Sequence, residues 1–327
     1  MAIQGSGAIS FSDLAEEFGD TIPYSLSEFY RDGDLVPGVN TNVAASGAIR
    51  LGTFYNSVNE LLQSVTSSAS INAQTIFGSD WGTNIPKRLN IPSGVTIGTL
   101  TIPTGMGGTL EVDVYGEVQG TGGSAGSGAG GHAIISNQSF TLNVKSGGAV
   151  RGGGGGGGAG GTGGDGTYNV NNSATAASYP AYCVYGSNPN WQNLHPQQVY
   201  GSNYQSFSQG PPRGEYNDQP WYQITVYYRT PTSTTGGSGG GGGRGRGYNQ
   251  TLASGSSGSA GGTNAGAGGT GGTGGDWGQA GATGASGANG NVTNGSAGSA
   301  GGAAGKAVQM NAGTVTVNNA GTINGSY

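Results

Sequence analysis

The sequence has few of the residues on which enzymes and secreted domains usually depend. Its 327 residues include one cysteine, Cys183, two histidines, His132 and His195, and only 8% charged side chains. A lone cysteine forms no intrachain disulfide, so we interpret Cys183 as a small, half-buried apolar residue. There is no apolar run of membrane-spanning length, and the N-terminus lacks the basic and apolar regions of a signal peptide. We therefore expect no membrane insertion.

Catalytic, metal-binding and nucleic-acid-binding patterns are also missing. The net charge is −5 and the densest basic cluster is the pair Arg244 and Arg246, so a nucleic acid partner has no support. No nucleophile, metalloprotease or phosphate-loop motif occurs, and the carboxylates are scattered, so we expect no enzyme, no cofactor and no obligatory metal. Asp165, Asp276 and Glu215 could pair as glycosidase carboxylates, but both aspartates end the same GGTGGD sequence, which favours structural turns.

Glycine is abundant instead. The chain has 73 glycines, about three times the usual share. Glycine loses much backbone entropy on folding and adds no side chain to a core, so these stretches are either ordered by backbone hydrogen bonds or disordered. The low charge and the 8% aromatic content favour order.

The glycines follow a period of three. Glycine occupies every third position from Gly266 to Gly290, and the register fails at Thr293. Three residues per turn is polyproline II geometry, and the lack of proline in this run disfavours collagen. We predict a bundle of polyglycine II helices, whereas a flexible linker, the alternative, fits poorly with Trp277 inside the run. The predicted runs cover residues 120–131, 152–166, 236–247 and 256–304.

Composition divides the chain into three parts. We assign residues 1–75 to a small helical docking region, 76–118 to a β-rich connector and 119–327 to a glycine-rich domain interrupted by an insertion at 168–235. The predicted fold class is therefore mainly β with a polyglycine II helix bundle and a small helical N-terminal region.

The first part repeats a short theme at residues 9–14, 25–30 and 49–55, each typical of a short capped helix. Ser12 and Ser27 are the N-cap candidates. Apolar residues at helical spacing predict one longer helix from Phe54 to Val65. Because so small a core is marginal, we expect docking or self-association. The docking candidates are Phe11, Leu14, Phe18, Leu26, Phe29, Tyr30, Phe54 and Tyr55.

The connector alternates apolar and polar residues between Pro-Ser-Gly and Pro-Thr-Gly turns, which predicts short hairpins. The same strand, turn and glycine pattern occurs three times, as LEVDVYGEVQGTGG (110–123), FTLNVKSGGAVRGG (140–153) and VTVNNAGTINGS (315–326). A repeated unit that ends in glycine predicts layers of β-structure that bracket the glycine helices.

Four segments carry a resemblance to a known group of proteins: GSGAISFSDLAEEFG, SLSEFYRDGDLVP, IPSGVTIGTLTIPTGMGGTLEV and AVRGGGGGGGAGG. They resemble glycine-rich tail fibres and receptor-binding adhesins of tailed bacteriophages, including T-even-type adhesins and siphophage central tail fibres. The resemblance implies a virion protein at the tail fibre or tail tip, with an N-terminal part that docks on other tail proteins. It also implies loops that recognise a bacterial surface receptor, either an outer-membrane protein or a polysaccharide.

The insertion is rich in tyrosine, a residue that gives binding loops a large contact area at little entropic cost. Residues 221–228 are its best predicted strand, with Tyr222, Ile224 and Val226 on one face. The aromatic residues could equally form the insertion's own small core. We place the receptor-contact candidates outside the strand: Tyr182, Tyr185, Trp191, Tyr200, Tyr204, Arg213 and Tyr216.

The leading hypothesis is a homotrimeric receptor-binding tail-fibre protein. The alternatives are a structural virion protein, such as a capsid decoration or tail collar, and an antifreeze protein, since some of those are polyglycine II bundles.

Overall fold

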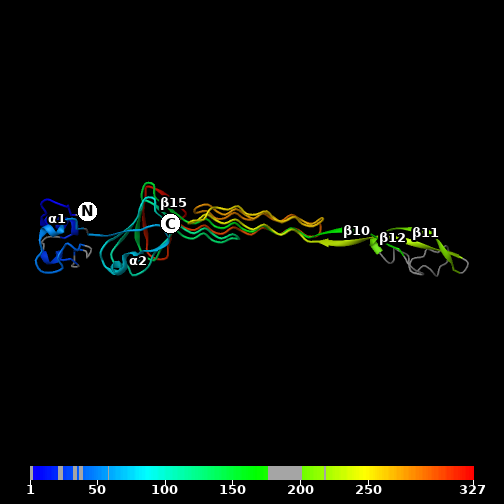
Figure 1. Cartoon of the computed structure of the whole chain (residues 1–327), viewed down its shortest axis with the longest axis horizontal. Helices are drawn as coiled ribbons and strands as arrows, with labels where there is room; N and C mark the ends of the chain where they lie inside the picture. Colours follow the sequence, from blue (N-terminus) through cyan, green and yellow to red (C-terminus); the bar gives the residue numbers. More distant parts are fainter. Residues whose placement is uncertain are drawn as a thin grey trace.

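The computed structural model describes residues 3–20, 25–31, 35–36, 40–57, 59–175, 201–216 and 219–327. These residues form an elongated molecule with four parts in a row (Figure 1). The N-terminal unit (residues 3–57) is followed by a stack of short β-strands, then by a rod of glycine-rich segments, and finally by a three-stranded sheet at the far end.

The N-terminal unit contains three short helical turns, α1 (Phe11–Phe18), η1 (Leu26–Phe29) and η2 (Leu51–Phe54). The prediction of three short helices is confirmed, but the N-caps are Ser10 and Ser25 instead of Ser12 and Ser27. Ser10 fits because its Oγ accepts the N–H of Asp13 at 3.2 Å while the Asp13 carboxylate accepts the N–H of Ser10 at 2.6 Å.

A longer helix from Phe54 to Val65 was the wrong prediction. This stretch contains β1 (Leu61–Ser64), which pairs in parallel with β3 (Lys87–Ile91), and β2 (Ser68–Asn72) follows it. Leu61 and Val65 are buried, whereas Leu62 is 57% exposed, so successive side chains point to opposite faces. Hydrogen bonding to β3 makes residues 61–64 a strand, although their apolar residues are spaced as in a helix. The short helices α2 (Ala73–Phe77) and η3 (Gly78–Gly82) come next.

The β-stack consists of two sheets whose strands all pair in parallel. One sheet has the order β1-β3-β5-β8-β14, and the other has the order β13-β7-β4-β6-β9-β15, with β2 also beside β4. The remaining strands are β3 (Lys87–Ile91), β4 (Thr96–Ile102), β5 (Leu110–Val114), β6 (Glu117–Gln119), β7 (Ile134–Ser136), β8 (Phe140–Val144), β9 (Ala149–Arg151), β13 (Val308–Met310), β14 (Val315–Asn319) and β15 (Thr322–Asn324).

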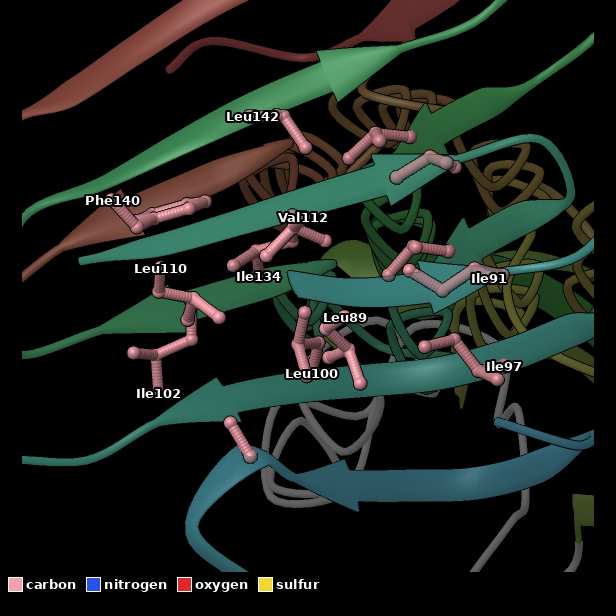
Figure 2. Packing of buried hydrophobic residues seen from close by; sticks show 14 of the residues in the cluster. Leu89, Ile91, Ile97, Leu100, Ile102, Leu110, Val112, Ile134, Phe140 and Leu142 are labelled. Carbon is pink, nitrogen blue, oxygen red and sulfur yellow. The ribbon is translucent and has the colours of Figure 1, made fainter. Parts of the chain in front are cut away.

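The predicted hairpins are therefore wrong, whereas the three sequence repeats are real structural units. Each turn carries the chain from one sheet to the other, so equivalent strands of successive repeats lie side by side. Val112 pairs with Leu142, and Leu142 pairs with Val317. The inward residues of both sheets form one apolar core (Figure 2), in which Leu89, Ile97 and Leu142 are fully buried.

The glycine-rich segments leave the β-stack at a break between two short strands that lie side by side with one longer strand, β4. Both β6 and β7 pair with β4, Val118 opposite Ile97 and Ile134 opposite Leu100. In the next layer β9 pairs with β6 and β13 pairs with β7. Residues 120–133 connect β6 to β7, and residues 152–307 connect β9 to β13, so both connections leave the stack at the same place in successive layers. The second connection includes most of the rod and the distal end of the molecule.

The rod (residues 120–131, 152–165 and 236–305) is built around its central segment, residues 152–165. Gly157, Gly160 and Gly163 donate their N–H groups to the carbonyls of Gly243, Gly240 and Gly237, each at 2.8 Å. Comparable bonds at intervals of three residues link the central segment to 266–275, 279–289 and 294–305, and its first half also bonds to 120–131. The segment 251–261 lies outside this ring and bonds to 236–246 and 266–275.

Glycine content follows the position of each segment in the rod. Residues 152–158 are buried and all glycine, because neighbours approach them from every side. An added Cβ on Gly157 would lie 2.0 Å from the carbonyl oxygen of Gly272. Two residues in three are glycine in 266–275, and one in three in 279–290, where the remaining positions are mostly exposed. The period of three in the sequence therefore records contacts between segments.

The far end is an antiparallel sheet, the distal sheet, with the order β10-β12-β11. It comprises β10 (Gly166–Thr175), β11 (Tyr204–Tyr216), which follows the short helix η5 (Gly201–Asn203), and β12 (Gln219–Thr234). The strand predicted at 221–228 lies within β12. Val226 is fully buried and Tyr227 is 41% exposed, so the predicted alternation of faces holds at these two positions.

Candidate functional site

The distal sheet is attached to the rod by a network of polar side chains. Asp165 donates its N–H to Thr293 Oγ1 at 2.7 Å. Thr167, the second residue of β10, donates its N–H to Asn291 Oδ1 at 2.8 Å. Its carbonyl accepts from Nδ2 of Asn291 at 2.9 Å and from Nδ2 of Asn264 at 3.0 Å. Two turns at the end of the rod thus fix the direction in which β10 leaves it.

The distal sheet presents hydroxyl and amide groups. Asn169, Asn171 and Ser173 are exposed along β10. On β12, Tyr227 is exposed, and its hydroxyl lies 3.5 Å from the Oγ of Ser208 on β11. Such a surface can form hydrogen bonds and stack on a ligand, but it holds no charged pair in the part of the sheet whose side chains are described.

Most of the predicted receptor-contact residues fall outside the described side chains. Tyr204 is half-buried at the start of β11, where its Cα lies opposite Tyr228. Arg213 and Tyr216 belong to β11, but only their backbone is described. Tyr182, Tyr185, Trp191 and Tyr200 lie outside the described residues, as does Cys183.

Sequence reasoning missed the exposed residues of β10 and β12. The predicted strand 221–228 includes Tyr227, which is not among the contact candidates, although its alternation with Val226 indicates the opposite, exposed face. Asn169 and Asn171 have no aromatic signal around them, because β10 contains one aromatic residue, Tyr168.

The docking candidates of the N-terminal unit are mostly core residues. Phe29 and Phe54 are fully buried, Phe18 is 7% exposed, and the rings meet edge to face at centroid distances of 6.2 to 6.3 Å. Leu14 is also fully buried in this cluster. These four side chains support the fold, so the prediction that they touch a partner is corrected: each is already covered by the others.

Three other docking candidates remain accessible. Phe11 is half-buried, and its ring lies 6.4 Å from that of Phe29. The hydroxyls of Tyr30 and Tyr55 donate to the carbonyls of Gly47 and Gly7 and hold two loops in place. Leu26 belongs to η1, but only its backbone is described.

The other end of the rod is held by an aromatic and cationic cluster. The guanidinium groups of Arg151 and Arg246 lie 5.8 Å and 5.4 Å from the ring centroid of Trp277. Asp276 accepts from Arg246 at 3.2 Å and from the N–H of Trp277 at 2.8 Å. Trp277 therefore anchors a turn between two rod segments, which agrees with order in this run.

Asp165 and Asp276 do not form a catalytic pair. The segments 152–165 and 266–275 run in opposite directions, since Gly275 bonds to Gly155 and Gly266 bonds to Gly164. The two carboxylates therefore lie at opposite ends of the rod. The described residues contain no group of three or more potential metal ligands and no helix that is long and apolar enough to cross a bilayer.

Comparison with known proteins supplies an independent finding. Residues 59–217, which span most of the β-stack, the central rod segment and β10 and β11, match the family model of the phage tail fibre adhesin Gp38. Among solved structures the chain is similar to the gp37-gp38 adhesin tip complex of the bacteriophage S16 long tail fiber, with 18% identity, full coverage of both chains and a TM-score of 0.38. Curated protein sequences gave no match. The family match agrees with the motifs of the sequence and supports a receptor-binding adhesin of the virion's tail fibre.

Proposed function

We propose that the N-terminal unit attaches the protein to another tail protein and that the distal sheet contacts a receptor on the bacterial surface. One observation carries this division: the N-terminal unit and the distal sheet lie at opposite ends of the molecule, with the β-stack and the rod between them (Figure 1). The protein then acts by binding and not by catalysis. Of the predicted docking region, residues 1–75, we assign attachment to residues 3–57, because β1 and β2 pair with strands of the β-stack.

We also propose that the rod is a polyglycine II bundle. Bonds between segments recur every third residue, and the glycine content of each segment rises with the number of its neighbours. Both properties follow if each segment is a helix with three residues per turn and no internal hydrogen bonds. Such a bundle would keep the distal sheet at a fixed distance from the fibre.

For the assembly we propose three copies per fibre. The buried core of the described part of the N-terminal unit comprises seven apolar residues, which is small for an independent unit. Contacts among copies, or with the fibre, would supply the missing burial. Mass photometry of the purified protein distinguishes a trimer from a monomer that attaches to a trimeric fibre.

A truncated insertion tests the receptor-binding role. Val170 and Thr230 are Cα partners in β10 and β12, so an Asn-Gly turn can replace residues 171–229 and close a short hairpin above the intact junction with the rod. Virions with this variant should contain the protein in normal amount but adsorb to host cells no faster than particles that lack it. Adsorption at the wild-type rate would overturn the proposal.

The location of the two ends on the particle tests the docking role. In a cryo-EM map of the intact virion, residues 3–57 should contact the fibre while residues 166–234 point away from it. The opposite orientation would contradict the proposal.

A further inference from the structure

The two edges of the distal sheet differ in their protection against pairing with another strand. The outer strand β11 has Pro211 and Pro212 in its middle, and its pairing with β12 is irregular at three places. Proline, charge and bulges are the usual means by which proteins block an open edge. β10, at the other edge, is ten residues long, pairs with β12 without a break, and contains no proline and no charged residue.

Thr167 shows which groups of β10 point away from the sheet. Its N–H and its carbonyl both bond to Asn291, and so neither faces β12. In an antiparallel pair the N–H and C=O of one residue point to the same side, and the side alternates along the strand. The backbone groups of Asn169, Asn171 and Ser173 therefore also point outward, and no described residue bonds to them.

Asn291 occupies the place that a neighbouring strand would take. Its side-chain amide accepts the N–H of Thr167 at 2.8 Å and donates to the carbonyl of Thr167 at 2.9 Å. One residue of an added antiparallel strand makes the same two contacts through its own C=O and N–H. The edge is thus capped by an amide at its first outward position, and it continues as a row of outward donors and acceptors spaced about 6.8 Å apart.

We propose that the outer edge of β10 binds an extended segment of a receptor protein, which adds a strand to the distal sheet. The occupant is a polypeptide because only another β-strand repeats donors and acceptors at this spacing, whereas a polysaccharide does not. It is an uncharged segment, because β10 carries no charge that would select an ionic partner. This inference rests on the proposed function, since it names the partner of the same end of the molecule.

The place of the edge agrees with this occupant. β10 lies at the far end of the molecule from the N-terminal unit (Figure 1), where a cell-surface protein can reach it. The exposed side chains of Asn169, Asn171 and Ser173 lie on one face of the strand and can bond to the side chains of the incoming segment.

Two substitutions at one position separate backbone pairing from side-chain recognition. Asn171→Pro removes an N–H that points out of the sheet and leaves every bond to β12 in place, whereas Asn171→Ala keeps the N–H and removes only the side chain. We expect Asn171→Pro to lower the adsorption rate constant about tenfold or more and Asn171→Ala to change it by about twofold or less. Unchanged melting temperature and protease resistance of the purified variants confirm that the sheet is intact.

Hydrogen exchange measures the pairing directly and does not depend on a variant that folds. With outer-membrane vesicles from host cells as the probe, exchange in peptides that cover 169–173 should slow, and purified lipopolysaccharide should have no such effect. Equal protection by lipopolysaccharide would overturn the inference in favour of a polysaccharide ligand. Protection on self-association of the protein alone would overturn it in favour of a second copy.

The outcomes separate this inference from the proposed function. If the truncated insertion abolishes adsorption but Asn171→Pro adsorbs normally, or if Asn171→Ala is as defective as Asn171→Pro, then the distal sheet binds the receptor without strand addition. If the truncated insertion itself adsorbs normally, the proposed function fails as well.

Discussion

Alanine at Gly157 should destabilise the rod far more than its single methyl group suggests. An ideal Cβ at this position lies 2.0 Å from the carbonyl oxygen of Gly272 and 2.5 Å from its carbon. Carbon and oxygen atoms of neighbouring chains normally stay about 3.3 Å or more apart, so the two segments must separate by about 1 Å. No flexible side chain can absorb this shift, because both contacting groups belong to the backbone.

The cost has two parts. Inserting a methyl group into a tightly packed site costs about 1–3 kcal/mol. The displacement also lengthens the bonds from Gly157 N–H to Gly243 and from Gly272 N–H to Gly158, both 2.8 Å, and each bond contributes about 1 kcal/mol. The unfolding free energy of the Gly157→Ala protein should therefore fall by about 3–5 kcal/mol.

Gly241→Ala is the matched control, because it makes the same chemical change in the same rod. The nearest atom to an added Cβ there is Ser256 Oγ at 3.6 Å, an ordinary contact. Alanine reduces the entropy of the unfolded chain, so this variant should be as stable as wild type or gain up to about 1 kcal/mol. Urea unfolding of both proteins gives the comparison. If the two differ by less than about 0.5 kcal/mol, the backbone of the central segment is not closely packed and the account of the rod is refuted.

Three further predictions concern polar groups outside the distal sheet. Ser299→Ala removes the hydroxyl that accepts the N–H of Ala159 at 2.7 Å, and urea unfolding should show a loss of about 1 kcal/mol; no loss would show that this hydroxyl is dispensable. Burial, with the charge of Lys306, lowers the pKa of His132, whose Nδ1 accepts the Lys306 N–H at 3.0 Å. Since the unfolded chain then binds the proton more readily, the melting temperature should fall as the pH drops below 6.5, and His132→Gln should flatten this dependence. Lys87→Met removes an ammonium group that donates to three backbone carbonyls at 2.9 to 3.0 Å, so stability should fall by about 3 kcal/mol, which an unchanged urea midpoint would contradict.

The β-stack illustrates which part of the fold can be predicted from sequence. The three repeats predict stacked layers because Val112, Leu142 and Val317 recur at equivalent positions, and the layers pair at these residues. The direction of pairing is not encoded locally. A Pro-Ser-Gly turn between two alternating runs is as compatible with a hairpin as with a step between two sheets. Parallel pairing becomes favourable only when the next layer is present.

The candidate site was predictable as a segment and not as a set of residues. Tyrosine content indicates the insertion, and the alternation in β12 places Val226 inside and Tyr227 outside, as the structure has them. The outer edge of β10, where no described residue bonds to the backbone of residues 169–173, has no such signal. The outward direction of its backbone groups follows from pairing with β12 and from the contact between Thr167 and Asn291. These two residues are 124 positions apart along the chain.

Glycine spacing in the rod is informative once the contacts are known, because each third position of a segment faces one direction. A segment with neighbours on every side needs glycine at all three positions, as in 152–158, whereas a segment with one free side keeps a larger residue there, as in 266–275 with Ala267, Thr270 and Thr273. The free side is then the place where sequence can change without disturbing the rod. The free sides, the turns and the distal sheet can therefore vary while the rod is kept, whereas a side chain added between segments would separate them.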